Sequence, residues 1–129
     1  MTAEFGIATL DAIDPEPFPE SGIPHWALTE ALGCTEMRVT AVTLDPGDAT
    51  APHTHERQEE VYVALDGGHV IVDGHSHAVA PGGVVRFGPD AVRSVRNETD
   101  DTQTWLMFGA PPHGTAADFG EYRMPSDEG

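Results

Sequence analysis

Two histidines and a glutamate stand close together near the middle of the chain. His53 and His55 are two residues apart, and Glu60 follows five residues later. Side chains alternate between the faces of a strand, so both imidazoles point to the same side of an extended segment. Glu60 has the opposite parity and joins them only if the chain turns between His55 and Glu60. Two imidazoles and one carboxylate can hold a mononuclear transition metal with positions left open for a ligand. The sequence therefore predicts a site for one divalent metal ion, either iron, manganese, nickel or zinc.

Short strands separated by tight turns are expected around these residues. Residues 36–44 are rich in threonine and valine, which suit a pleated sheet. The ligand residues lie on two expected strands, 51–55 and 60–65. Turn sequences such as Asp-Pro-Gly-Asp at 45–48 and Asp-Gly at 73–74 follow strand-like runs. Strands of four to nine residues with such turns between them indicate an all-β sandwich or small barrel.

The N-terminal part gives a weaker signal. Residues 5–10 suit a short first strand. Residues 29–32 suit one helical turn ending at Gly33 in the left-handed conformation, and an extended conformation fits nearly as well. We divide the chain into three parts: an N-terminal extension (1–35), a barrel (36–110) and a C-terminal tail (111–129).

The chain is strongly acidic. It has 22 aspartate and glutamate residues against 6 basic residues, all arginine, for a formal charge of -16. Such a surface repels the phosphates of nucleic acids and anionic lipid head groups, so we expect neither nucleic acid nor membrane as a partner. Salt would screen the self-repulsion of this charge, which predicts adaptation to a salt-rich cytoplasm. A melting temperature that does not change in molar salt would contradict that hypothesis.

Cysteine usage and the absence of targeting signals favour the cytoplasm. Cys34 is the only cysteine, so no disulfide can form within the chain. The N-terminus lacks the basic region and apolar run of a signal peptide. No stretch approaches the roughly 18 apolar residues that a membrane helix needs. We expect a soluble cytoplasmic protein.

The metal-binding residues form part of a longer motif, which resembles the first motif of the cupin superfamily. The motif consists of Gly47, His53, His55, Glu60 and Gly67. The spacing to Gly67 favours Glu60 over Glu59 as the ligand, and their opposite parity lets only one of them point inward. The resemblance extends over about residues 36–110. It implies a small single-domain cupin, whose fold is a double-stranded β-helix, or jelly roll, with the motif residues at the barrel mouth.

The same resemblance implies a small-molecule ligand and a homodimer. Small cupins pair through an edge of the β-helix. The apolar N-terminal residues Phe5, Ile7 and Leu10 could form a strand that is added to the sheet of a partner.

The second cupin motif departs from the family pattern. Its turns and strand are matched by residues 81–90, and Asn97 lies near the asparagine of the family. The histidine that supplies the fourth ligand in the family is replaced here by Val92, followed by Arg93. Three protein ligands remain. A fourth could come across the barrel from one of three histidines: His69, His75 or His77.

Arg93, Arg96 and Tyr62 are the candidate substrate-binding residues. A buried arginine needs a partner, and an inward-facing one would bind an anionic group through its guanidinium. Strand parity does not decide which arginine faces inward, and a surface role for either is equally open. Tyr62 is a core residue that could also line the pocket. No catalytic residue is predicted. An oxygenase, isomerase or lyase is an analogy from the family, and a non-catalytic module that binds or senses a small molecule, with or without metal, is the alternative.

Overall fold

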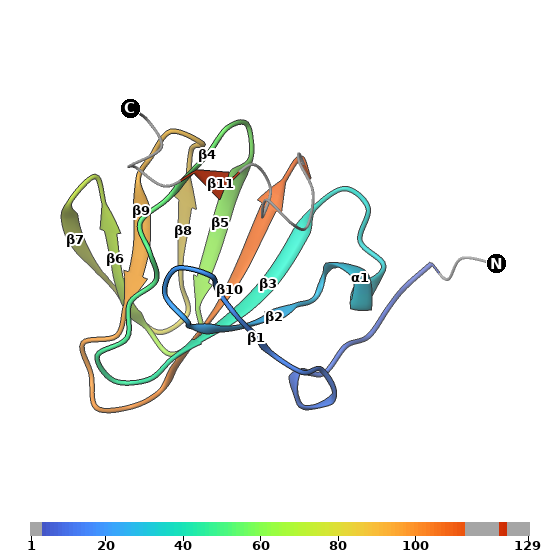
Figure 1. The fold of residues 1–129 in the computed structure, drawn as a ribbon, viewed down its shortest axis with the longest axis horizontal. Helices are drawn as coiled ribbons and strands as arrows, with labels where there is room; N and C mark the ends of the chain where they lie inside the picture. The colour runs from blue at the N-terminus through green and yellow to red at the C-terminus, as the bar shows by residue number, and fades with distance from the viewer. Residues whose placement is uncertain (1–3, 113–121, 124–129) are drawn as a thin grey trace.

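Antiparallel strands form the framework of the computed structural model, which describes residues 4–112 and the backbone of residues 122–123 (Figure 1). The predicted C-terminal tail therefore lies almost entirely outside the described residues. The larger sheet contains β1 (Glu16–Pro17), β2 (Pro24–Ala27), β3 (Arg38–Leu44), β10 (Gln103–Ala110), β5 (Glu59–Ala64) and β8 (Gly83–Phe87), in this order. The smaller sheet contains β7 (His75–Val79), β6 (Gly68–Val72) and β9 (Arg93–Arg96), and a short β4 (Thr54–His55) pairs with β11 (Tyr122–Arg123).

The two main sheets pack face to face around one apolar core. Val70 and Val95 of the smaller sheet share this core with side chains of the larger sheet, which are Val42, Leu44, Tyr62, Ala64, Phe87 and Trp105. All of these residues are almost completely buried. The arrangement confirms the predicted all-β fold, a double-stranded β-helix, or jelly roll.

Strand β5 shows how the sequence positions the site. Its burial alternates along the strand, with Glu60, Tyr62 and Ala64 inside and Glu59 exposed. β5 lies between β10 and β8, which supply hydrogen bonds on both of its edges. A strand paired on both sides cannot rotate, so Glu60 and Tyr62 are directed together into the barrel.

The predicted hairpin with the Asp73-Gly74 turn is confirmed between β6 and β7. Both turn residues have positive φ, 49° for Asp73 and 86° for Gly74. This is the left-handed conformation that a two-residue hairpin loop needs.

The N-terminal residues differ in part from expectation. The strand expected within this chain at residues 5–10 is wrong, because these residues form no strand here and a 3-10 helix lies at Leu10–Ala12. A strand that these residues would add to the sheet of a partner stays a prediction. A strand needs a neighbour for its hydrogen bonds, and no strand among the described residues pairs with them. The helical turn is confirmed as α1 (Thr29–Leu32), ending at Gly33 with φ 79°. Strand β2 joins the larger sheet from within the predicted N-terminal extension. No helix in the described part of the chain is long and apolar enough to cross a membrane.

Candidate metal centre

His53 and His55 are held in place by backbone hydrogen bonds to the segment that leads into β9. The N–H and C=O groups of His53 pair with those of Arg93, each at 3.0 Å. The N–H of His55 donates to the carbonyl oxygen of Pro89, also at 3.0 Å. Both imidazoles therefore project from a backbone that is fixed on one side of the barrel mouth, and the chain then turns before β5.

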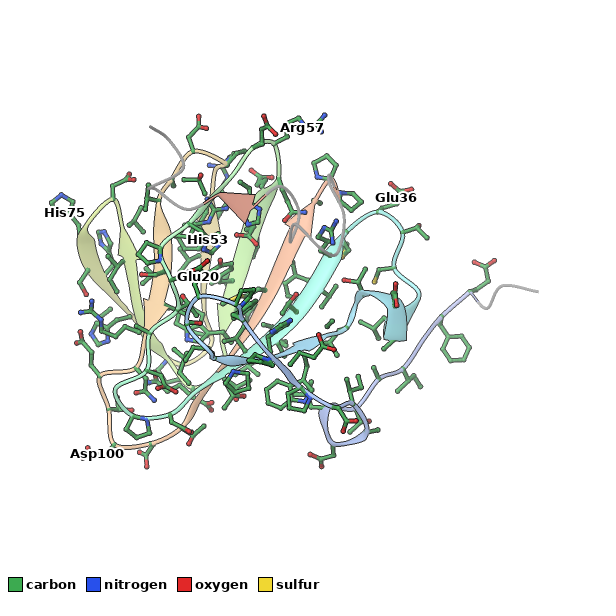
Figure 2. The ribbon with its side chains drawn as sticks, viewed as in Figure 1. Glu20, Glu36, His53, Arg57, His75 and Asp100 are labelled. Carbon is green, nitrogen blue, oxygen red and sulfur yellow. The ribbon has the colours of Figure 1, made fainter. Side chains whose placement is uncertain are left out.

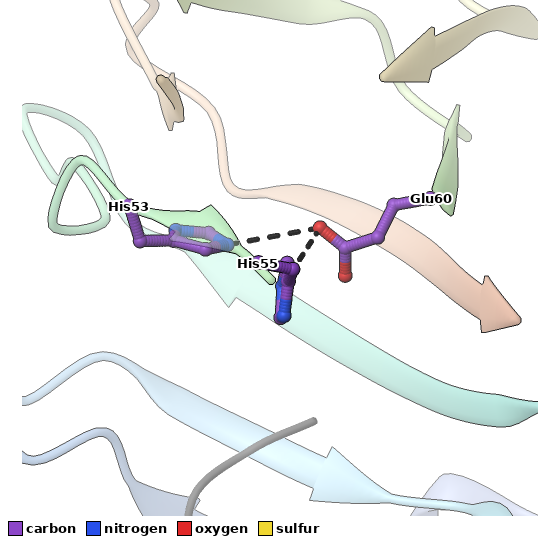
Figure 3. A group of neighbouring side chains, drawn as sticks. All are labelled: His53, His55 and Glu60. Carbon is purple, nitrogen blue, oxygen red and sulfur yellow. Dashed lines mark ion pairs between the residues drawn. The ribbon is translucent and has the colours of Figure 1, made fainter. Parts of the chain in front are cut away.

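Glu60 meets both imidazoles from strand β5. Its Oε1 lies 3.2 Å from Nε2 of His55 and 3.7 Å from Nε2 of His53 (Figure 3). The candidate ligand atoms of the three residues all lie within 4.8 Å of one another. Their side chains are largely buried, at 12% exposure for His53, 3% for His55 and 11% for Glu60.

These separations suit a transition metal. Nitrogen and oxygen ligands lie about 2.1 Å from zinc, so two of them are about 3.0 Å apart at a right angle and about 3.4 Å apart at a tetrahedral angle. The measured 3.2 and 3.7 Å are close to this range. Nδ1 of His53 lies 3.2 Å from the carbonyl oxygen of Ala51. With a metal bound, a proton on Nδ1 would donate to this carbonyl and leave the lone pair of Nε2 for the metal.

Two further side chains bind Glu60. Arg93 donates to its Oε1 from Nε at 3.1 Å and from Nη2 at 2.9 Å. The hydroxyl of Tyr62 donates to the same oxygen at 3.1 Å. Arg93 and Tyr62 are 0% and 1% exposed, so the carboxylate is held by a buried network.

The sequence of residues 40–109, more than half of the chain, matches the family model of the cupin domain. The chain belongs to the cupin family. A search of curated proteins found no match.

Several solved structures are similar to this cupin over most of its length. A sugar phosphate isomerase of the cupin superfamily from Silicibacter pomeroyi is 25% identical, with a TM-score of 0.71 and coverage of 81% of this chain and 74% of that one. A protein from Thermus thermophilus is 28% identical, with a TM-score of 0.65 and coverage of 81% and 96%. The polyketide cyclase RemF from Streptomyces resistomycificus is 19% identical, with a TM-score of 0.73 and coverage of 92% and 84%, and shows the fold alone.

The candidate substrate-binding residues separate into two groups in this cupin. Arg93 and Tyr62 face inward and contact Glu60. Arg96 is exposed and pairs with Glu98 at 3.3 Å. Glu59 is exposed as well and pairs with Arg86. Substrate binding by any of the three candidates stays a prediction.

The proposed sources of a fourth ligand do not join the site in the described residues. The metal-ligand group there contains His53, His55 and Glu60 alone. Nε2 of His69 lies 3.5 Å from a carboxylate oxygen of Glu98. His75 and His77 are exposed on β7, and Figure 2 shows His75 at the outer edge of the smaller sheet, apart from His53.

Val92 stands where the family has its fourth ligand, and its backbone N–H donates to Asp73. The neighbouring side chain, that of Arg93, is the one that reaches Glu60.

Reasoning from the sequence missed that Arg93 and Tyr62 bind Glu60. A signal for Tyr62 was available, because it lies two residues after Glu60 on one strand and shares its face. Arg93 is 33 residues from Glu60 in the chain, and no local pattern connects them.

The electrostatics keep Glu60 ionised and Tyr62 protonated. Burial alone would raise the pKa of Glu60, but hydrogen bonds and charge interactions with His53 and His55 outweigh it and hold the pKa well below its usual range. Burial raises the pKa of Tyr62 well above its usual value, and the negative charge of Glu60 adds to this. Tyr62 therefore remains a hydrogen-bond donor to Glu60.

Metal affinity should depend on pH through His53. Burial lowers the pKa of His53, and the hydrogen bond with Glu60 offsets this only in part. The imidazole therefore stays neutral below about pH 6.5, where a free imidazole becomes half protonated. In titrations with Zn²⁺ we expect constant affinity above that pH and a decline only below it, as protons compete for the ligands. Affinity that does not decline at any pH below that of a free imidazole, about 6.5, in the range where the protein stays folded would contradict histidine ligation.

Proposed function

We propose that this protein is a metal-binding cupin that holds one divalent transition metal through His53, His55 and Glu60 and takes a small anionic or oxygen-rich molecule as its ligand. The observation that carries the proposal is the convergence of three buried ligand atoms within 4.8 Å. A metal bound there would polarise a carbonyl, enediol or phenolate oxygen, chemistry that suits an isomerase, lyase or oxygenase.

The residues of the chain have separable tasks in this proposal. His53 and His55 direct Nε2 into the site from a fixed backbone. Arg93 and Tyr62 hold the Glu60 carboxylate in one orientation. The burial of these side chains limits access of water and strengthens the electrostatic interactions between them. The name of the Silicibacter pomeroyi structure supports a sugar phosphate as one ligand to test.

A second candidate function is a binding or sensing module without turnover. It is favoured by the contacts of Arg93 and Tyr62, both of which are directed to protein atoms. In this alternative the barrel binds its ligand, and the chain supplies no acid or base to transform it.

Metal content and ligand binding distinguish the two. Elemental analysis of the purified protein should give about one transition-metal ion per chain, and His53→Ala should lose it. Binding of sugar phosphates is then compared by calorimetry in both proteins. If the natural protein carries no stoichiometric metal and His53→Ala binds the same compounds equally well, the enzyme proposal fails.

We also propose a cytoplasmic, salt-adapted homodimer. The strand register aligns five apolar residues across the outer face of the larger sheet: Trp26, Ala41, Leu106, Val63 and Val84. This row ends at Val84, which is 62% exposed, and the N-terminal Phe5 and Ile7 are 76% and 82% exposed. Exposed apolar side chains of this kind support docking of a second copy. For a chain of this charge we still expect neither nucleic acid nor a membrane as a partner.

Light scattering in molar salt tests the homodimer. Salt screens the repulsion between two copies of a chain with charge -16. We expect a particle of about twice 13.8 kDa, and Val84→Asp should shift it toward the single chain by placing a charge in the apolar row. A single-chain mass for the natural protein would contradict the proposal.

A further inference from the structure

Arg93 is a permanent positive charge at the centre of the site. Its side chain is completely buried, and an arginine keeps its charge in proteins. Nη1 donates to three backbone carbonyl oxygens, those of Gly88 and Pro89 at 3.1 Å and Ala91 at 2.7 Å. The guanidinium also lies 5.4 Å from the centre of the Phe87 ring. These contacts fix its position independently of Glu60.

One oxygen of Glu60, Oε1, makes all the contacts described above. Oε1 accepts from Nε and Nη2 of Arg93 and from the hydroxyl of Tyr62. It is also the oxygen that faces Nε2 of His55 and of His53. A carboxylate oxygen has two lone pairs, so a metal that binds at this oxygen competes with the guanidinium.

Arg93 also connects the two halves of the site. Its backbone pairs with His53, while its side chain binds Glu60. The site can therefore stay assembled in the metal-free protein, because the charge of the buried carboxylate is already balanced.

We propose that Arg93 is a resident counter-cation that neutralises Glu60 in the metal-free protein and thereby weakens the affinity of the His53, His55 and Glu60 group for divalent metals. The inference rests on the proposed metal-binding function. It assigns Arg93 a positioning role that sets how easily metal enters and leaves.

Two effects of removing Arg93 oppose each other. Loss of a residue that orients a metal ligand typically weakens metal binding about 10–100-fold. Loss of the charge has the opposite sign, because it removes a cation next to the metal and leaves Glu60 buried without a counter-charge until metal binds. Repulsion between a guanidinium and a divalent ion a few ångströms apart is poorly screened at a buried site. The charge effect should therefore be the larger.

The experiment compares Arg93→Gln with Arg96→Gln. Both variants change the net charge equally, but Arg96 is exposed and paired with Glu98. Purified metal-free proteins are titrated with Zn²⁺ and with Mn²⁺ by calorimetry, and their melting temperatures are measured with and without metal.

We expect Arg93→Gln to bind metal at least about tenfold more tightly than the natural protein, and Arg96→Gln to bind it as tightly as the natural protein. Metal-free Arg93→Gln should melt at a lower temperature, and metal should restore it. A purely structural role would lower the melting temperature without tightening metal binding.

Failure of this inference and failure of the proposed metal-binding function give different results. If the natural protein binds metal and Arg93→Gln binds it equally or more weakly, the inference is wrong and the proposed function stands. If neither binds metal, both are wrong. If Arg93→Gln does not fold even with metal present, Arg93→Lys decides, because lysine keeps the charge. If Arg93→Lys binds metal about as tightly as the natural protein, the result supports a role for the charge. If Arg93→Lys binds metal tenfold more tightly, the result overturns that role.

Discussion

Replacing Glu60 with glutamine is expected to lower the free energy of unfolding by about 3–5 kcal/mol. The substitution leaves the guanidinium of Arg93 buried without its carboxylate partner, since Nε and Nη2 both donate to Glu60. A neutral amide accepts a hydrogen bond but does not balance the charge. For a chain of this size the melting temperature should fall by roughly 10–20 °C. Chemical and thermal unfolding of the metal-free protein measure the effect.

Glu59→Gln is the matched control, because it is the same change at the adjacent residue. Glu59 pairs with Arg86 at the surface, where the two side chains are 52% and 65% exposed. Exposed ion pairs contribute about 0–1 kcal/mol, so the control should unfold almost like the natural protein. Equal stabilities for the two variants would show that the buried Arg93–Glu60 pair does not support the fold.

Replacing His55 with alanine is expected to weaken metal binding by more than about 100-fold, beyond the loss that follows removal of a residue that merely orients a ligand. His55 is the less exposed of the two imidazoles and the one closer to Glu60. Removing it leaves one imidazole and one carboxylate. Calorimetric titration with Zn²⁺ gives the affinities.

His77→Ala provides the comparison for this loss. His77 belongs to a second His-x-His pair, with His75, on the exposed strand β7. Its removal should leave metal affinity unchanged. A loss of binding in His77→Ala, or full binding in His55→Ala, would place the metal elsewhere.

Parts of this site could be predicted because they depend on local geometry. The two-residue spacing of His53 and His55 fixes their shared side, and the opposite parity of Glu59 and Glu60 sends only one carboxylate inward. Both expectations are borne out, since Nε2 of each histidine faces Oε1 of Glu60, and Glu60 lies inside while Glu59 is exposed. The double-stranded β-helix was predicted from the turn pattern together with a family motif, since alternating strands alone fit any sandwich or barrel.

The remainder depends on contacts between distant segments. Parity could not choose between Arg93 and Arg96, because the two are three residues apart and the start of β9 was unknown. Arg93 faces inward where its backbone pairs with His53 in an isolated antiparallel bridge, a contact between distant segments that no short-range pattern reports. The expected strand at residues 5–10 does not form for a related reason. Its apolar residues suit a strand, but a strand also needs an edge to pair with.

We expect His53, His55 and Glu60 to form one metal site. The most direct test is X-ray diffraction from crystals of the metal-loaded protein, recorded at the absorption edge of zinc. One anomalous peak per chain should appear, bound by Nε2 of His53, Nε2 of His55 and the carboxylate of Glu60. The absence of a peak there, or a peak bound only by other residues such as His75 and His77, would contradict it.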